Sequence, residues 1–190
     1  EFRRVLFRST LCTLCACILS GAYAHAAESP KGGSAANVGM PANFLIVTDR
    51  IHTSAQPTRA QLVELKANGY ALVINLATPA SAGAIADEGS LIAKQGISYV
   101  NVPVDFRAPS LQDFDLFSTI LRQTGSRRVL VHCQVNKRAS AFTFLHRVVH
   151  DGIAPDEAWK NVVTIWEPDP QWIDLIRVVL KRHGINFDPF

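Results

Sequence analysis

Short runs of β-branched and other apolar residues alternate with helical patterns along this chain, and that alternation is the strongest constraint on its fold. Residues 71–76, 97–104 and 128–132 have the length and composition of strands. Helical patterns separate them, so crossover connections must join the strands and the strands must lie mostly parallel. We therefore predict an α/β fold with a small, mostly parallel sheet of four or five strands flanked by helices.

Capping patterns mark the starts of two helices, one before the strand at 71–76 and one between the strands at 97–104 and 128–132. Thr58 and Gln61 have the spacing of a capping box, and the helix that follows should stop before Gly69. Ser110 precedes apolar residues at helical spacing, with Asp113 at the capping-box position of that helix. Each pattern indicates where a helix begins, because a hydroxyl oxygen there can accept a hydrogen bond from a free backbone N–H of the first turn.

The last third of the chain is predicted to be helical. Residues 139–150 are apolar nearly all round, which is typical of a helix buried at the centre of a fold. Pro155 stands just inside the start of the next helix, and Asp169 or Pro170 starts the last one. At the other end of the domain, residues 44–47 are expected to form a short strand.

Residues 1–26 are predicted to be a secretory signal peptide. An apolar run at 11–21 has the length of a signal core, and Ala24 and Ala26 are small residues at the positions that signal peptidase reads. The run is shorter than the roughly 20 apolar residues that cross a bilayer. The alternative interpretation is a buried N-terminal helix. Residues 1–9 resemble a translated sequencing adapter.

Cleavage of this signal would place the mature protein in the periplasm or outside the cell. Residues 27–42, rich in Ala, Gly, Ser and Pro, are then a flexible leader, and residues 43–190 are the folded domain. The chain has 19 Lys and Arg against 16 Asp and Glu, a net charge of +3 without a long basic run. We therefore expect no nucleic-acid partner and no stable membrane insertion after cleavage.

The predicted mature chain keeps one cysteine, Cys133, directly after the strand at 128–132. A short polar loop then leads to Arg138 and the buried helix. Backbone N–H groups in such a loop form an anion-binding nest, and the helix N-terminus adds positive potential that favours a nucleophilic thiolate. Arg138 offers paired donors to an oxyanion. This arrangement fits covalent phosphoryl transfer; the alternative is a cysteine buried as a small apolar residue.

The segment resembles the active-site loop of the cysteine-dependent protein tyrosine phosphatases, in particular the bacterial dual-specificity-like branch and its phosphatase-like proteins. His132 and Cys133 stand at a strand end as in that family, and segments 54–57, 73–76 and 99–104 follow the family's order. The resemblance implies a dual-specificity-phosphatase-like domain. It also implies hydrolysis of a phosphorylated protein or small phosphate ester through a phosphocysteine intermediate, without a metal or organic cofactor. The sequence does not predict the oligomeric state.

The loop departs from the family pattern by one residue. The family has five residues between Cys and Arg, whereas four separate Cys133 from Arg138, so Ala139 stands at the usual arginine position and Ser140 follows it. Either the loop is one residue shorter and Arg138 binds phosphate, or Ala139 has replaced the arginine in a weak or inactive phosphate-binding protein. We favour the shorter loop. Rhodanese-like sulfurtransferases also have a four-residue gap, but His132 is more similar to the phosphatases.

The resemblance implies a general acid, an Asp on a loop roughly thirty residues before the cysteine. Asp105 lies 28 residues before Cys133 (133 − 105 = 28), directly after the strand at 97–104, and is our candidate. Asp113 and Asp115 are rivals, although a cap explains Asp113. The alternative for Asp105 is an ordinary loop carboxylate.

The remaining loop residues receive supporting roles. His132 is expected to orient the loop, and Ser140 would assist the thiolate only if Ala139 stands in the arginine position. Asn136 occupies the family's glycine position, where Asn tolerates a left-handed backbone. The predicted substrate-binding residues are Gln134, Val135, Asn136, Lys137 and Ala139.

Overall fold

The computed structural model describes residues 39–189, in which five strands form one sheet in the order β1-β2-β5-β3-β4. In this part of the chain β1 pairs antiparallel with β2, and the other neighbouring strands are parallel. The sheet confirms the predicted α/β architecture, at the upper of the two strand numbers. The strands are β1 (Leu45–Ile46), β2 (Ile51–Ser54), β3 (Leu72–Asn75), β4 (Ser98–Asn101) and β5 (Val129–His132).

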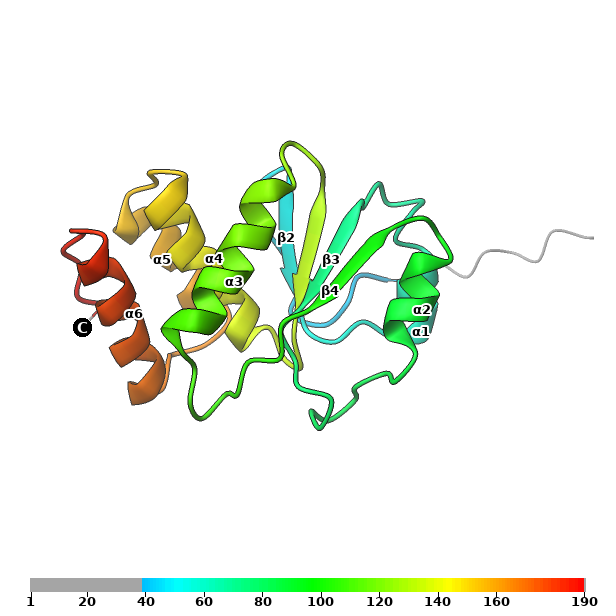
Figure 1. Cartoon of the computed structure of the whole chain (residues 1–190), viewed down its shortest axis with the longest axis horizontal. Coiled ribbons are helices and arrows are strands. Elements are labelled where there is room, and N and C mark those ends of the chain that lie inside the picture. The colour runs from blue at the N-terminus through cyan, green and yellow to red at the C-terminus, as the bar shows by residue number, and fades with distance from the viewer. Residues whose placement is uncertain (1–38, 190) are drawn as a thin grey trace, which may run out of the picture. The chain divides into compact units, whose positions relative to one another are not determined.

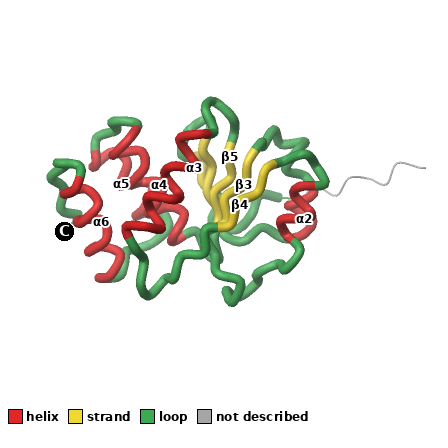
Figure 2. The backbone as a smooth tube through the Cα atoms, viewed as in Figure 1, coloured by secondary structure: helices red, strands yellow, loops and turns green. Residues whose placement is uncertain are grey.

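Helices cover both faces of the sheet, with α1 and α2 on one side and α3 to α6 on the other (Figures 1 and 2). The capping boxes predicted for Thr58 with Gln61 and for Ser110 with Asp113 are both present. Pro155 and Pro170 occupy the first turns of their helices, as predicted. The helices are α1 (Arg59–Val63), α2 (Glu88–Ala93), α3 (Leu111–Gln123), α4 (Lys137–His150), α5 (Pro155–Val163) and α6 (Pro170–Arg182).

Alternating side chains of the central strands build two cores. Ile74 and Val131 belong to the larger core, which lies under α3 to α6. Val73 and Leu130, one residue earlier on each strand, belong to the smaller core under α1 and α2. Because successive side chains of a strand point to opposite faces, a strand covered on both faces usually carries apolar residues at consecutive positions. This explains why β3 and β5 are visible in the sequence as continuous apolar runs.

Strand β2 was not predicted from the sequence. All four of its residues are buried, yet three of them, His52, Thr53 and Ser54, are polar. His52 Nδ1 lies 2.7 Å from the hydroxyl of Tyr70, and Thr53 accepts a hydrogen bond from Asn136. Hydrogen bonding offsets the cost of burying these groups, so β2 lies inside the sheet without an apolar pattern of its own.

Part of the predicted organisation lies outside the described residues. This applies to the signal peptide predicted for residues 1–26 and to the leader predicted for 27–42, except for its last four residues. Within the described range 39–189, no helix is both long and apolar enough to cross a membrane.

Candidate active site

Cys133 directly follows β5, at the carboxyl ends of the parallel strands. Strands β2 and β3 flank β5, and the Cys133 backbone N–H donates to the carbonyl of Ser54 at 3.4 Å. The Cys133 side chain is buried and forms no disulfide. Ligands of open parallel sheets bind at such strand ends, so the position of the thiol suits a reaction centre.

The loop after Cys133 is held by the segment that follows β2. The backbone N–H of Gln56 donates to the carbonyl of Gln134 at 3.2 Å, and Ala55 forms an isolated bridge with Val135. The two segments therefore lie side by side, although about eighty positions separate them in the sequence. This contact gives a structural role to residues 54–57, which the sequence resemblance identified only by their order.

Asn136 turns the loop into α4. Its φ of 71° is left-handed, which confirms the conformation expected for this position. Its Nδ2 donates to the Asn43 carbonyl at 2.7 Å and to the Thr53 hydroxyl at 3.0 Å. The sharp turn lets α4 begin at Lys137, two residues before the expected start. The first backbone N–H groups of a helix have no carbonyl partner within the helix. Their partial positive charge therefore faces the loop that precedes α4.

Arg138 lies on this first helical turn and is 6% exposed. Its Nε and Nη1 have no hydrogen-bond partner among the described residues. The centre of its guanidinium lies 5.8 Å from the centre of the Phe106 ring. Burying a charged group without a partner is costly, so these donors are suited to an anion that enters the site.

Cys133 and Arg138 line the same pocket, which has a volume of about 200 Å³. Ala139, by contrast, is fully buried in the larger core and is not among the residues that line the pocket. The start of α4 at Lys137 places residue 138, rather than residue 139, in the pocket that Cys133 lines. The lining residues are Phe106, Cys133, Gln134, Val135, Lys137 and Arg138.

An aromatic wall, made by the packed rings of Phe106 and Trp166, borders the pocket. Lys137 Nζ lies 4.8 Å from the centre of the Trp166 ring and 5.6 Å from that of Phe106, within the range of cation–π attraction. Trp166 donates from Nε1 to the Ser140 hydroxyl at 3.2 Å, and that hydroxyl donates to the carbonyl of Lys137 at 3.0 Å. Ser140 thus holds the first turn of α4 against the wall.

Asp105 is exposed on the loop that contributes Phe106 to the pocket. Its Oδ1 accepts a hydrogen bond of 2.9 Å from the backbone N–H of Arg107. The two rivals are engaged elsewhere: Asp113 caps α3, and Asp115 pairs with Arg182. Asp105 is therefore the acid of the three that adjoins a pocket-lining residue.

A buried carboxyl group that could not be predicted from the sequence lies beside His132, the residue that precedes Cys133. Glu88, the first residue of α2, has its Oε1 2.9 Å from Nε2 of His132. It also accepts hydrogen bonds from Nε2 of Gln56 at 3.3 Å and from Nδ2 of Asn75 at 3.1 Å. Its neighbours in the sequence form no recognisable motif, so only the fold reveals these contacts.

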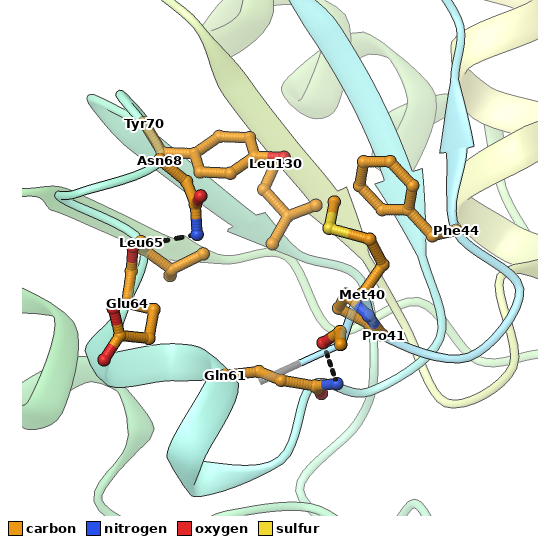
Figure 3. Close-up of a pocket in the computed structure, with 10 residues that line it drawn as sticks. Met40, Pro41, Phe44, Gln61, Glu64, Leu65, Asn68, Tyr70 and Leu130 are labelled. Carbon is orange, nitrogen blue, oxygen red and sulfur yellow. Dashed lines mark hydrogen bonds between the residues drawn. The ribbon is translucent and has the colours of Figure 1, made fainter. Parts of the chain in front are cut away.

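A second hollow lies away from the cysteine loop, beside α1 (Figure 3). Met40 and Phe44 border it on one side and Leu65 and Tyr70 on the other. Its volume of about 20 Å³ leaves room for about one water molecule. Across residues 39–189, no cluster of three or more His, Cys, Asp or Glu side chains is arranged to hold a metal ion.

Comparison with solved structures finds similar proteins, although no family model and no curated protein matches the chain. One structure of a "Putative phosphatase (DUF442)" from Shewanella putrefaciens CN-32 is 29% identical, with a TM-score of 0.70 over 75% of this chain and 94% of its own. A second structure so described, from the same organism, is 31% identical, with a TM-score of 0.65 over 75% and 91%. The core catalytic domain of the S. cerevisiae PP-IP phosphatase SIW14, in complex with citrate, shares the fold at 15% identity, with a TM-score of 0.61 over 77% and 88%.

Proposed function

Because this chain belongs to the DUF442 family, within the cysteine-dependent protein tyrosine phosphatase superfamily, we propose that it is a periplasmic phosphatase that hydrolyses phosphate monoesters through a phosphocysteine intermediate. The sheet and helices of the chain match dual-specificity-phosphatase-like structures, as predicted. The periplasmic location rests on the signal peptide predicted for residues 1–26. The proposed partner is a phosphorylated protein or a small phosphate ester.

The observation that carries this proposal is the shared pocket of Cys133 and Arg138. The guanidinium is buried with two nitrogens unpartnered among the described residues, and the thiol lines the same cavity. An oxyanion bound there would pair with a charge that is otherwise costly to bury. A phosphoryl group satisfies that requirement and is the electrophile that a thiolate can attack.

The proposed reaction has two steps. In the first, the Cys133 sulfur attacks phosphorus, the S–P bond forms, and the ester P–O bond breaks as Asp105 protonates the leaving oxygen. In the second, water attacks the phosphocysteine, the S–P bond breaks, and Asp105 takes a proton from the water. Inorganic phosphate and the Cys133 thiolate are released. Arg138 and the amides of the loop stabilise the charge on the equatorial oxygens.

Hydrolysis of an aryl phosphate by the purified protein tests this proposal. Cys133→Ser should abolish turnover, and Arg138→Ala should lower kcat/KM by about 100-fold or more, because charge-assisted donors to the transferring group are lost. Arg177→Ala, an exposed arginine on α6, is the matched control and should retain the wild-type rate. Unchanged turnover in Cys133→Ser would show that Cys133 is not the nucleophile.

Two further outcomes separate the alternatives. Binding of phosphate or vanadate without turnover would identify a phosphate-binding protein that has lost catalysis. Formation of thiocyanate from thiosulfate and cyanide, without phosphate release, would identify a sulfurtransferase. The four-residue spacing between Cys133 and Arg138 makes this second assay necessary.

A further inference from the structure

We propose that Glu88 is a positioning residue for Cys133, acting through His132. The inference rests on the proposed function, because it concerns the reactivity of the same thiol. His132 is the last residue of β5 and precedes Cys133 directly, while Glu88 begins α2 on the opposite side of the sheet from α4. The two side chains are almost completely buried.

The contact between these residues has the distance of an ion pair. Nε2 of His132 lies 2.9 Å from Oε1 of Glu88, although the N–H is not aligned as in an ideal hydrogen bond. A carboxylate beside one ring nitrogen of a histidine fixes the orientation of the ring and which nitrogen carries the proton. Nδ1 of His132 has no partner among the described residues, so Glu88 is the ionic contact that holds this ring.

Glu88 also joins the ends of the three strands that surround the loop. Asn75 is the last residue of β3, His132 is the last of β5, and Gln56 follows β2 by two residues. Each directs a side-chain nitrogen toward the Glu88 carboxyl group. The carboxyl group therefore holds together the ends of β2, β3 and β5, next to the Cys133 loop.

These contacts require an acceptor at position 88. Asn75 cannot reverse its amide to suit a donor there, because its Oδ1 already accepts a hydrogen bond of 2.7 Å from the backbone N–H of Ala77. Its Nδ2 consequently faces Glu88, at 3.1 Å. A carboxylate can accept on both oxygens, whereas the amide of Gln has one acceptor and two donors. Glu88→Gln keeps the volume but sets donor against donor at Asn75 or His132.

The same network reaches the catalytic loop through the backbone. The carbonyl of His132 accepts from the Leu76 N–H at 2.8 Å, and the Gln56 N–H donates to the Gln134 carbonyl at 3.2 Å. Residues on both sides of Cys133 are thus bonded to segments that Glu88 holds. A change at Glu88 should therefore alter the presentation of the thiol without touching the pocket-lining residues.

Glu88→Gln, compared with Asp87→Asn, tests this inference. Asp87 is the neighbouring carboxylate, but it is exposed and pairs with Arg59, so the control removes the same charge one residue away. We expect Glu88→Gln to lower kcat by about 10-fold, the lower end of the loss found when the partner of a metal-binding histidine is replaced, with little change in KM. Asp87→Asn should keep the wild-type kcat. Equal kcat values for the two variants would overturn the proposal.

A double-mutant cycle tests whether Glu88 acts through His132. If it does, adding Glu88→Gln to a His132→Asn protein should cost clearly less activity than adding it to the wild type, because the effects of interacting residues are not additive. The same loss in both backgrounds would show that Glu88 acts independently of His132. Should Glu88→Gln fail to fold, Glu88→Asp against Asp87→Glu makes the same comparison, and only Glu88→Asp should lower kcat.

Labelling of Cys133 by iodoacetamide, followed by mass spectrometry, separates this inference from the proposed function. The reaction requires no phosphatase activity, so it can be measured even if the wild type hydrolyses no phosphate ester. We expect labelling of Cys133 to be slower in Glu88→Gln than in Asp87→Asn at the same pH. Identical labelling rates in two folded variants would refute the positioning role, whatever the outcome of the phosphatase assay.

Discussion

Trp172 donates a hydrogen bond of 2.9 Å from its indole Nε1 to the carbonyl oxygen of Phe106, a residue 66 positions earlier. The bond ties α6 to the loop that carries Asp105. The Phe106 ring also packs against Trp166 and Trp172, with ring centres 5.7 Å apart in each pair. The loop that holds the proposed acid is therefore anchored to Trp166 and Trp172, in the last third of the chain.

Replacing Trp172, which anchors this loop, should lower both the free energy of unfolding and kcat. Trp172→Phe keeps an aromatic ring but leaves the Phe106 carbonyl without its donor. The free energy of unfolding should fall by about 1–3 kcal/mol, and kcat should fall as Asp105 loses its fixed position. Trp159→Phe on α5 is the matched control, since Trp159 packs against Phe144 and should affect stability alone. A fall in kcat of the same size in both variants would contradict the anchoring role.

Asp105→Asn should show the pattern of a lost general acid. The loss in kcat should reach about 10²–10⁴-fold for esters of weakly acidic alcohols, because their leaving oxygen needs a proton. Activated aryl phosphates should lose much less. The measurement is kcat across a series of phosphate esters that differ in leaving-group acidity. Asp113→Asn, which weakens the capping box of α3, should reduce stability without changing that dependence. A uniform loss across the series would eliminate Asp105 as the acid.

The elements that could be predicted from the sequence are those whose signals are local. Strands β3 and β5 are continuous apolar runs, and the capping boxes of α1 and α3 each join two residues of one short segment, Thr58 with Gln61 and Ser110 with Asp113. Strand β2 could not be predicted, because the partners of His52 and Thr53 lie 18 and 83 positions away. The first helix is predicted to continue until just before Gly69, but α1 ends at Val63 and turns fill the interval.

The site divides in the same way. The nucleophile loop at Cys133 was visible because a strand, a polar loop and a helix follow one another without interruption. The choice between Arg138 and Ala139 depended on a one-residue difference in loop length and on where α4 begins, and helix ends are poorly defined by sequence. Glu88 was invisible, because its partners come from three separate strand ends.

Two substitutions of Asn136 should separate its backbone conformation from its hydrogen bonds. Both Asn136→Gly and Asn136→Ala remove the side-chain bonds to Asn43 and Thr53. Only Ala must carry a Cβ at a φ of 71°, which costs about 1–2 kcal/mol in the left-handed region. Urea unfolding should therefore find Asn136→Ala the less stable of the two. Equal stabilities would show that the left-handed turn imposes no strain.

Stability should decline as the pH falls below 6.5, with His146 as a main cause. Burial lowers the pKa of His146 from 6.5 to about 3, and the nearby positive charges of His150 and Arg50 act in the same direction. The folded state therefore binds fewer protons than the unfolded state between these two pH values. The stabilisation from a neutral His146 is present above pH 6.5 and is lost as the pH falls toward 3.

Urea unfolding of the wild type and of His146→Gln, from pH 7.5 to pH 4.5, measures this contribution. Gln can keep a hydrogen bond to the Ser118 hydroxyl, which lies 2.8 Å from His146 Nδ1, but it does not titrate. The wild type should lose up to about 1.4 kcal/mol per pH unit through His146, and the variant should show a shallower decline. Some decline should persist in the variant, because burial also lowers the pKa values of His52 and His150. Parallel curves for the two proteins would mean that the pKa of His146 is the same in the folded and unfolded states, which would contradict the prediction.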